Sequence, residues 1–418
     1  MGKVLAIPRM RLYYLGNGLS EIGDYALWLA AAVWVKELTG STSRAALCML
    51  CLISGTLLSP LTGLIVDRVR RRPLILITNA LTGLMVLSLI QVHRASQVWL
   101  IYAVMFLYGL AGSITGSAMS SLLPRMVPEE LLGSANGFSQ ALAQGQRLIT
   151  PAIGVGLLAR YGGSAVALLD AGTFGVSLVC WAFIRVEEEK PQRSGAHWLS
   201  ETAAGFAFLG KTPVLRQLTV ALTVGVLVMG FLETLGLAIA TTGLHHSPSW
   251  IGVMVTAMGV SGILGGLSAG AVMSRIGPGR LVALGLAIVG GSVLVLAVPV
   301  DAVVVLGALL LGLGLPFIVV GSLTAMQLNT PNELMGRVMG ADNFLITAGQ
   351  SVGIGTGAAL IAVLPYRDLC FLAAAVLALV TLYLVTRPEQ RRKPVDASAP
   401  ETGPGPAEAL ATGPAQDL

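Results

Sequence analysis

Long runs of apolar residues follow one another along almost the whole chain, and short polar or basic loops separate them. Each run holds roughly 20 residues, the length of helix that crosses the hydrocarbon core of a bilayer. Because lipid offers the backbone no hydrogen-bonding partners, each run must be helical. Twelve runs can be drawn, at residues 12–35, 44–66, 74–92, 98–121, 137–159, 164–184, 214–240, 250–273, 281–299, 302–325, 341–363 and 367–386. The pattern predicts an all-α integral membrane protein with twelve transmembrane helices.

The two halves of the chain repeat one another. The basic loop at 63–72 returns in weaker form at 270–280, where Ser274 replaces the acidic residue of the first copy. The segment Pro-Glu-Glu-Leu-Leu-Gly at 128–133 returns as Pro-Asn-Glu-Leu-Met-Gly at 331–336, at nearly the same offset. Each copy follows an even-numbered run. We therefore expect two pseudo-symmetric bundles of six helices, an arrangement that recurs among transporters.

The same pattern suggests domain boundaries. Residues 1–184 are expected to form the N-terminal bundle and 214–386 the C-terminal bundle, with a cytoplasmic linker at 185–213 between them. Residues 387–418 are rich in proline and lack aromatic residues. A segment of that composition cannot bury a core, so we expect a disordered cytoplasmic tail.

Charges are scarce and unevenly placed. Only 11% of the residues are charged, whereas a soluble domain carries about 25%. With the N-terminus in the cytoplasm, 20 of the 26 Lys and Arg residues fall in cytoplasmic segments or at the cytoplasmic ends of runs, five fall in outer loops or at the outer ends of runs, and only Arg147 lies in the interior of a run. Cytoplasmic loops of membrane proteins carry such an excess, so both termini are expected in the cytoplasm. The net charge of +5 is dispersed over short loops, which argues against nucleic-acid binding.

The chain lacks the signals of an enzyme or of a metal protein. It has no phosphate-binding Gly-x-x-x-x-Gly-Lys-[Ser/Thr] segment, so ATP is not expected to drive it. Cys48 and Cys51 have C-x-x-C spacing, but they lie inside an apolar run with no histidine nearby. We interpret them as small packing residues. No cofactor and no metal are expected.

Two sets of residues resemble a known family. The loop Gly63-x-x-x-Asp67-Arg68-x-x-Arg71-Arg72, between the second and third runs, resembles the cytoplasmic loop motif of the major facilitator superfamily. Residues 20–41 and 123–132 resemble the drug-efflux branch that contains macrolide exporters and the enterobactin exporter. The resemblance covers about residues 10–390. It implies a monomeric secondary exporter of a bacterial cytoplasmic membrane, which uses alternating access, is surrounded by lipid and exchanges protons for a small molecule.

Two positions depart from the family pattern. Tyr108 stands where the fourth span of the family carries an Arg. The Gly-Pro-x-x-Gly-Gly element of the fifth span is present only as Thr150-Pro151-Ala-Ile-Gly154-Val-Gly156. These departures weaken the case for proton antiport and leave an uncoupled facilitator or a transporter-like sensor as alternatives. A lysophospholipid or lipid transporter is a further alternative.

The first run carries a polar stripe. Asn17, Glu21, Asp24 and Trp28 follow at spacings of four, three and four, so they share one face of a helix. A charge near the bilayer centre is costly and is usually functional. We therefore expect Glu21 and Asp24 to bind the proton or coupling cation. Arg147 is expected at the depth of Glu21 and could form an ion pair with it. The alternative is a structural pair that only sets helix register.

Other residues are candidates for a substrate cavity. By the resemblance, spans one, four, seven and ten line it, which brings in Tyr102, Tyr108 and Glu233 beside the first-run stripe. A cavity carboxylate suits a cationic substrate, and aromatic surface suits a bulky amphiphile. Plain helix packing is the alternative for each tyrosine, and a wet position near the outer mouth is the alternative for Glu233.

Two further acids lie near the ends of runs. We expect Asp342 to cap the helix that follows Gly340, because free N–H groups and the helix dipole favour a carboxylate there. Asp170 is expected to form a hydrogen bond with a neighbouring helix.

The loop motif has a mechanical interpretation. Gly63 would allow a neighbouring helix to approach closely. Asp67 would pair with Arg68 or Arg72, or accept from the N-terminus of a helix in the second half, and so hold a cytoplasmic gate closed. Arg70 and Arg71 are expected only to set topology. The alternative is that all these arginines serve topology alone.

Overall fold

A computed structural model describes residues 2–188, 198–246, 250–361 and 363–391. The tail expected to be disordered therefore lies, from residue 392 onward, outside the described residues, as do 189–197 of the linker. Among the described residues all regular structure is helical.

The long helices fall into two sets of six spans, the second span of the first set being a broken pair. The first set is α2 (Pro8–Thr39), α3 (Thr42–Thr56) with α4 (Ser59–Arg68), α5 (Arg71–Ser88), α6 (Val98–Met126), α7 (Glu129–Tyr161) and α8 (Gly163–Phe183). The second set is α10 (Pro213–Ala238), α11 (Ile251–Ile276), α12 (Pro278–Leu296), α13 (Asp301–Asn329), α14 (Met335–Leu360) and α15 (Tyr366–Thr386). The predicted twelve-helix fold is confirmed. Short helices are α1 (Gly2–Leu5) and α9 (Trp198–Lys211), and α10 continues into a π-helical turn at Ile239–Gly243.

The helices differ in how apolar they are. In the described part of the chain, eight helices are long and apolar enough to span a membrane alone, and the broken pair α3–α4 adds a ninth span. The other three are α2, α7 and α14, which bring the total to twelve. These three carry more polar residues because they face the interior: α2 holds the predicted stripe, and α7 and α14 pack against helices of the other half.

The second span is broken, although the sequence pattern predicted a continuous run. The helix ends at Thr56 and restarts at Ser59, with Pro60 in the first turn of α4. Proline has no N–H to donate and fits best in the first turn of a helix, where that N–H would have no partner. Pro60 was therefore the sequence signal for this break.

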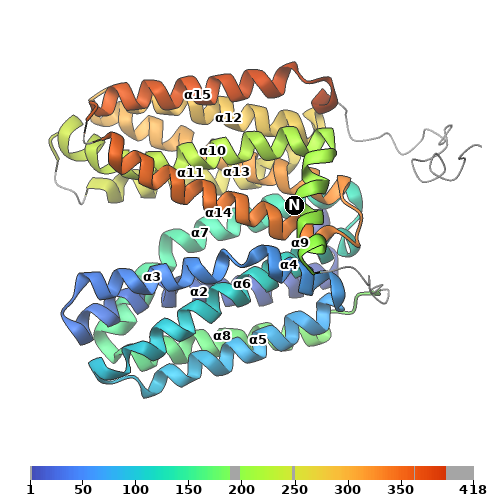
Figure 1. The fold of residues 1–418 in the computed structure, drawn as a ribbon, viewed down its shortest axis with the longest axis vertical. Helices are drawn as coiled ribbons and strands as arrows, with labels where there is room; N and C mark the ends of the chain where they lie inside the picture. Colours follow the sequence, from blue (N-terminus) through green and yellow to red (C-terminus); the bar gives the residue numbers. More distant parts are fainter. Residues whose placement is uncertain (1, 189–197, 247–249, 362, 392–418) are drawn as a thin grey trace, which may run out of the picture.

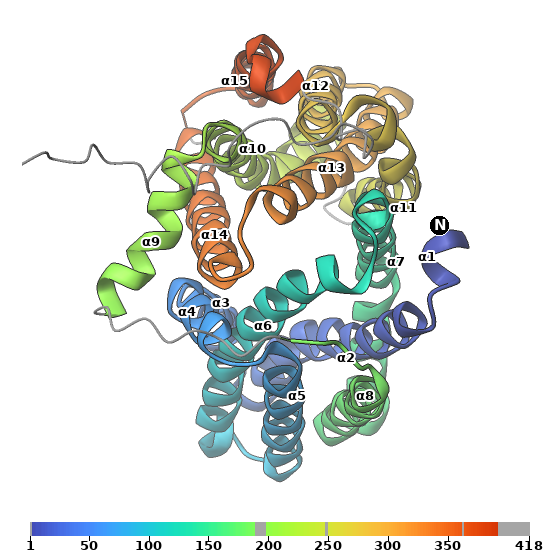
Figure 2. The ribbon, with the colours of Figure 1, turned by 90° about the vertical axis from the view of Figure 1, so that its right-hand side faces the viewer.

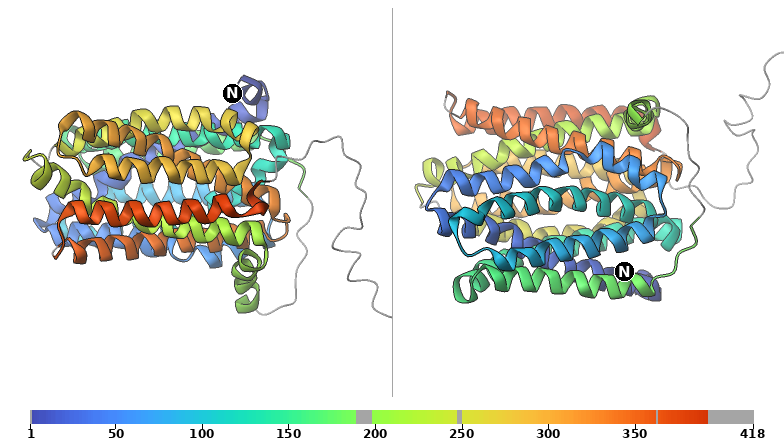
Figure 3. Two further views of the ribbon diagram at one scale, coloured as in Figure 1. Left: turned by 90° about the horizontal axis from the view of Figure 1, so that it is seen from above. Right: turned by 60° about the horizontal axis from the view of Figure 1, so that its bottom comes forward.

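The two bundles lie side by side with their helices roughly parallel (Figure 1). Helix α9 crosses the bundle at one end, where it contacts α4, α10 and α14 (Figure 3). We call this the linker end. Seen from that end, α4 meets α14 on one side of the molecule and α7 meets α11 on the other (Figure 2).

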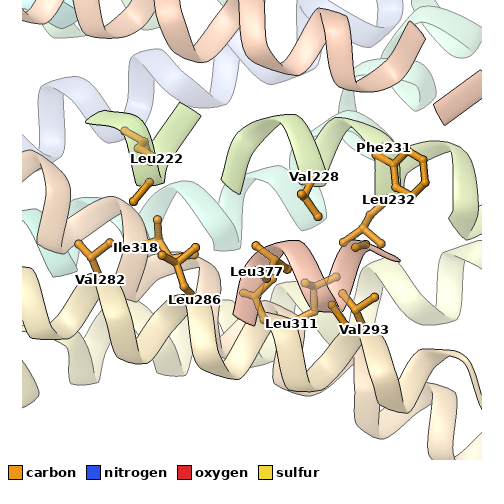
Figure 4. Close-up of a cluster of buried hydrophobic side chains, with 14 of the residues drawn as sticks. Leu222, Val228, Phe231, Leu232, Val282, Leu286, Val293, Leu311, Ile318 and Leu377 are labelled. Carbon is orange, nitrogen blue, oxygen red and sulfur yellow. The ribbon is translucent and has the colours of Figure 1, made fainter. Parts of the chain in front are cut away.

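The cores of the two bundles are organised differently. The C-terminal bundle has one long apolar cluster from end to end, part of which Figure 4 shows around Leu222, Leu286 and Ile318, and a small second cluster that includes Met273 and Phe317. The N-terminal bundle has two clusters along the helix axes. On α2 the first includes Tyr14 and the second begins at Leu27. The intervening segment of α2 carries the polar stripe, so the break in the apolar core marks the candidate site.

Candidate functional site

Glycines allow α2 to approach α8 closely at the break in the core. A side chain at Gly16 would meet Cys180 at 2.8 Å, and one at Gly23 would meet the carboxylate of Asp170 at 2.2 Å. Small residues at such contacts let membrane helices approach without voids. The close approach places Asp170, which is completely buried, beside Asp24.

A tyrosine joins these two carboxylates. The hydroxyl of Tyr108 on α6 donates a hydrogen bond to Asp24 and lies 3.2 Å from Oδ2 and 3.3 Å from Oδ1 of Asp170. The ring of Phe174 on α8 packs edge-on against Tyr108, with 6.0 Å between ring centroids. Asp170 does bond a neighbouring helix, as expected, but its proximity to Asp24 was not anticipated. The available signal was a carboxylate inside an apolar run.

No cation neutralises this cluster. Among the described residues, no Lys, Arg or His nitrogen lies within 4.0 Å of Glu21, Asp24 or Asp170. The expected ion pair between Glu21 and Arg147 is therefore wrong for this structure. The residue of α7 that faces α2 here is Gln146, whose side chain donates to the carbonyl of Gly18. Successive residues of a helix differ by about 100°, so Arg147 points away from Glu21 and instead lines a cavity with Asp24.

Three cavities meet at Asp24 and Tyr108. The first, of ≈ 620 Å³, lies between the two halves, within the range of about 300–1,000 Å³ that is typical of ligand sites. Its polar lining includes Glu21, Asp24, Thr56, Tyr108, Ser113, Ser117, Asp342 and Asn343. A second, of ≈ 310 Å³, is lined by Asp24, Tyr25, Trp28, Tyr108 and Arg147 among others. A third, of ≈ 170 Å³, lies inside the N-terminal bundle and includes Asn17, Glu21 and Asn79.

The other predicted cavity residues are distributed as follows. Trp28 lines the second cavity, and Asn17 lines the third while accepting a hydrogen bond from the indole of Trp181 at 3.1 Å. Tyr102 lines none of these cavities, because its hydroxyl donates to the carbonyl of Arg44 on α3 at 2.9 Å. Six residues separate it from Tyr108, which puts the two on different helix faces. The side chain of Glu233 lies outside the described part of the structure.

The cap predicted for Asp342 is wrong. Helix α14 begins at Met335, so Asp342 lies two turns inside it. There it faces the central cavity, and its buried Oδ1 has no hydrogen-bond partner in the described structure. The sequence pattern placed the helix start too late because the first turns of α14 are rich in small and polar residues.

The residue that caps α14 is Asp67, from the other half of the molecule. Its Oδ1 accepts from the backbone N–H of Gly336 at 2.7 Å, and its Oδ2 accepts from that of Arg337 at 2.9 Å. Gly63 permits this approach, since a side chain there would lie 2.2 Å from the carbonyl oxygen of Gly336. These are the contacts expected of Asp67 and Gly63; their role in gating stays a prediction.

The contacts of the arginines in the loop motif differ from those predicted. Arg71 reaches across to the second half, where its Nη2 donates to the carbonyl of Asn332 at 2.5 Å, and the same nitrogen lies 3.6 Å from Asp67 Oδ1. The expected pairing of Arg72 with Asp67 is wrong. Arg72 donates to the carbonyl of Ala182 at 2.7 Å, within its own bundle. The two differ because they leave the start of α5 about 100° apart.

The linker segment fixes the start of α5. The carboxylate of Glu188 accepts from the backbone N–H groups of Arg71 at 2.6 Å and Arg72 at 2.9 Å. A carboxylate at this position satisfies free donors and complements the positive end of the helix dipole.

A second contact joins the halves through α7 and α11. Here glycines alternate across the interface: a side chain at Gly137 would lie 2.5 Å from the carbonyl oxygen of Gly266, and one at Gly270 would meet Ser134 at 2.6 Å. Ser274, the counterpart of Asp67, donates to the carbonyl of Ala271 in its own helix at 2.8 Å. Among the residues of this contact that the structure describes, none makes a cap equivalent to that of Asp67.

Polar side chains connect the halves between these two contacts. Asn136 on α7 donates to Gln327 on α13 at 2.7 Å, and Gln327 donates to the carbonyl of Ser120 on α6 at 3.1 Å. Nearer the cavity, Asn343 donates to Ser113 at 3.1 Å. These bonds cover the linker-end side of the central cavity.

Twelve helices in two bundles around a central cavity define a multi-pass membrane transporter rather than an enzyme. The family model described as Major Facilitator Superfamily matches residues 13–354. The chain belongs to the major facilitator superfamily.

Relatives with names that denote drug efflux cover most of the chain. Macrolide efflux protein A of Streptococcus pyogenes is 20% identical over 349 residues, which cover 82% of this chain and 86% of that protein. Multidrug efflux pump Tap of Mycolicibacterium fortuitum is 28% identical over 311 residues, 70% of this chain and 74% of the relative. The resemblance to the drug-efflux branch is therefore confirmed.

Solved structures share the fold. The human organic anion transporter MFSD10 has a TM-score of 0.71 at 15% identity, covering 90% of this chain and 98% of that one. A bacterial homologue of the iron transporter ferroportin, in an outward-facing state, also has a TM-score of 0.71, at 17% identity and with the same coverage.

Proposed function

We propose that this protein is a secondary active efflux transporter that exports an amphipathic small molecule by proton antiport with alternating access. The observation that carries the proposal is the central cavity, which has the half-buried carboxylates of Glu21 and Asp24 at one wall and is covered by inter-bundle contacts at the linker end. The names of the relatives, macrolide and multidrug efflux proteins, support the direction and the kind of substrate.

The lining of the cavity supports a bulky amphiphile with a positive charge. Leu52, Leu323 and Ile346 supply apolar surface, and Glu21 and Asp342 supply acidic groups at opposite walls. Such a site would take a macrolide-like antibiotic, whose amine is cationic, or a siderophore. Acidic residues in an otherwise apolar pocket fix the orientation of a ligand and favour cations over neutral molecules.

Asp24 and Glu21 are the proposed coupling groups, and Arg147 lines the second cavity together with Asp24. A buried carboxylate without a cation must be neutralised by a proton or by a charged substrate. Competition between the two for the same groups would couple export to proton entry. The structure would represent the state closed toward the cytoplasm, with the linker end and both termini on the cytoplasmic side of a bacterial cytoplasmic membrane.

Transport in everted vesicles with an imposed pH gradient tests this proposal. We expect erythromycin or a cationic dye to accumulate when the gradient is applied, and we expect Asp24→Asn and Glu21→Gln to abolish the response. Asp368→Asn, an exposed acid in the first turn of α15, is the matched control. Accumulation that ignores the gradient and survives both substitutions would favour an uncoupled facilitator, and movement of labelled phospholipid alone would favour a lipid transporter.

A further inference from the structure

Asp170 is a completely buried carboxylate that lines none of the three cavities described above. We propose that Asp170 is a proton-binding residue, and that it shares one proton with Asp24 through the hydroxyl of Tyr108. The inference deepens the proposed function, on which it rests for its role in transport, by naming the internal acceptor of the proton. The proton-sharing itself is a property of the resting protein.

Counting hydrogen atoms leads to this proposal. Oxygen atoms of two carboxyl groups lie within hydrogen-bond distance of the Tyr108 hydroxyl, but that hydroxyl has a single hydrogen to donate. An ionised carboxylate can only accept. If Tyr108 donates to Asp24, its contact with Asp170 needs a second hydrogen, and a protonated carboxyl supplies it. Both contacts of the Tyr108 oxygen can be hydrogen bonds when the cluster consists of one carboxylic acid, one hydroxyl and one carboxylate.

The surroundings offer no other way to neutralise two charges. Glu21 on α2 adds a third acid to this region, while Arg147 on α7 is the cation that lines a cavity shared with Asp24. Neither aspartate has a basic nitrogen within 4.0 Å in the described structure. Helix α5 faces α8 here with a glycine, Gly83, against Phe174. Ionising both aspartates would bury two uncompensated negative charges.

The backbone is shaped to bring the two groups together. A side chain on Gly23 would lie 2.2 Å from the Asp170 carboxylate and 2.3 Å from the hydroxyl of Thr173. Phe174, one residue after Thr173, packs on the ring of Tyr108. One turn of α8 therefore supplies the acid, sets its distance from α2 and orients the bridging ring.

The two aspartates differ in their access to the cavities, so the proton would move from Asp24 to Asp170. Asp24 lines all three cavities and can take a proton from water there. It then donates to the Tyr108 oxygen, while the Tyr108 hydroxyl proton moves to Asp170. One O–H bond forms for each that breaks, and one proton is transferred with no change of oxidation state. A cationic substrate at Asp24 would then find an ionised group while the proton stays on Asp170.

Infrared difference spectroscopy on the purified full-length transporter tests the inference. The carbonyl stretch of a protonated carboxylic acid is expected in the wild type near neutral pH and lost at higher pH. Asp170→Asn and Asp24→Asn should each remove or shift this band, and Tyr108→Phe should change the pH at which it disappears while keeping the ring packing. Asp368→Asn should leave it unchanged. A band that is absent in the wild type, or unaltered in all three cluster variants, would overturn the inference.

Transport separates this inference from the proposed function. Asp170→Asn should bind a cationic dye as the wild type does but lose stimulation by a pH gradient. If the wild type shows the band without any gradient-driven export, the antiport proposal fails and proton-sharing stands. If export is coupled in the wild type and in Asp170→Asn alike, Asp170 is not the internal acceptor. Should Asp170→Asn fail to fold, the Tyr108→Phe pH profile decides, because a packing role alone would not move it.

Discussion

Two helix pairs, α4 with α14 and α7 with α11, make the most extensive contacts between the bundles, and the two contacts use different chemistry. Between α4 and α14, the carboxylate of Asp67 accepts two backbone hydrogen bonds from the start of α14. Between α11 and α7, the methyl of Met273 faces Gly133 and Gly270 packs on Ser134. The contacts derive from the same sequence repeat, yet only one of them is charged.

The helix starts explain the difference. Helix α7 has Glu129 and Glu130 in its own first turn, whereas α14 has no acidic residue in its first turn. A helix N-terminus is stabilised by negative charge. Helix α7 carries acidic residues in its first turn in every conformation, but α14 receives the charge of Asp67 only when α4 is docked. The electrostatic energy of the α4–α14 contact should therefore change when the bundles separate. The α7–α11 contact is held by close packing.

The largest expected effect follows from filling the glycine contact at Gly63. Gly63→Val would place a side chain 2.2 Å from a carbonyl oxygen of α14, which is backbone and cannot yield. We expect the linker-end closed state to be lost and export to stop. Distances between spin labels on α4 and α14 would measure the separation. Gly172→Ala, where a side chain meets nothing within 4 Å, is the control, and unchanged distances in Gly63→Val would contradict the prediction.

The next effect is removal of the charge at Asp67. Asp67→Asn keeps the shape but removes the charge and leaves one acceptor oxygen for two backbone N–H donors, so one bond is weakened and the other is lost. This should destabilise the closed linker end by about 2 kcal/mol, roughly a thirtyfold shift in population. The same spin-label pair measures the shift, with Asp368→Asn as the control. A matching shift from Ser274→Ala on α11 would show that the two contacts are equivalent after all.

Arg71 and Arg72 offer a sharper comparison within one motif. Arg71→Ala removes a bond across the bundles and should cost the closed state about 1 kcal/mol. Arg72→Ala removes bonds inside the N-terminal bundle and should leave the population of the closed state unchanged. Equal effects on the spin-label distances would mean that both arginines act through the fold of α5 and not across the interface.

The smallest effect is expected when an acidic residue is placed at position 274, the counterpart of Asp67 in the second copy of the loop motif. Ser274 is exposed and bonds its own helix, and α7 already has two acids in its first turn. Ser274→Asp should therefore change the closed population by no more than about 0.5 kcal/mol. A stabilisation comparable to the cost of Asp67→Asn would show that the contact can accept a charged cap.

Much of the fold was predictable because its causes are local. Lipid forces every apolar run into a helix, so the succession of runs and polar loops located the twelve spans, including the three more polar ones. For the acidic residue of the loop motif, the N-terminus of a helix in the second half was one expected partner, and Arg68 or Arg72 was the other. Pro60 and Asp170 stand out in the sequence, as a proline and an acid within apolar runs. Their structural roles depended on the neighbouring helices, which the sequence pattern does not place.

By itself, the sequence determined the number of spans, the two-fold repeat, the family and the stripe that contains Asp24. The tertiary structure alone decided that Asp170 and Tyr108 complete the site, that Arg71 and not Arg72 crosses the interface, and that Arg147 does not pair with Glu21. The reason is geometric. Side chains of successive residues point about 100° apart around a helix. Close packing at glycines determines how each helix is rotated about its axis, and this rotation determines which side chains meet.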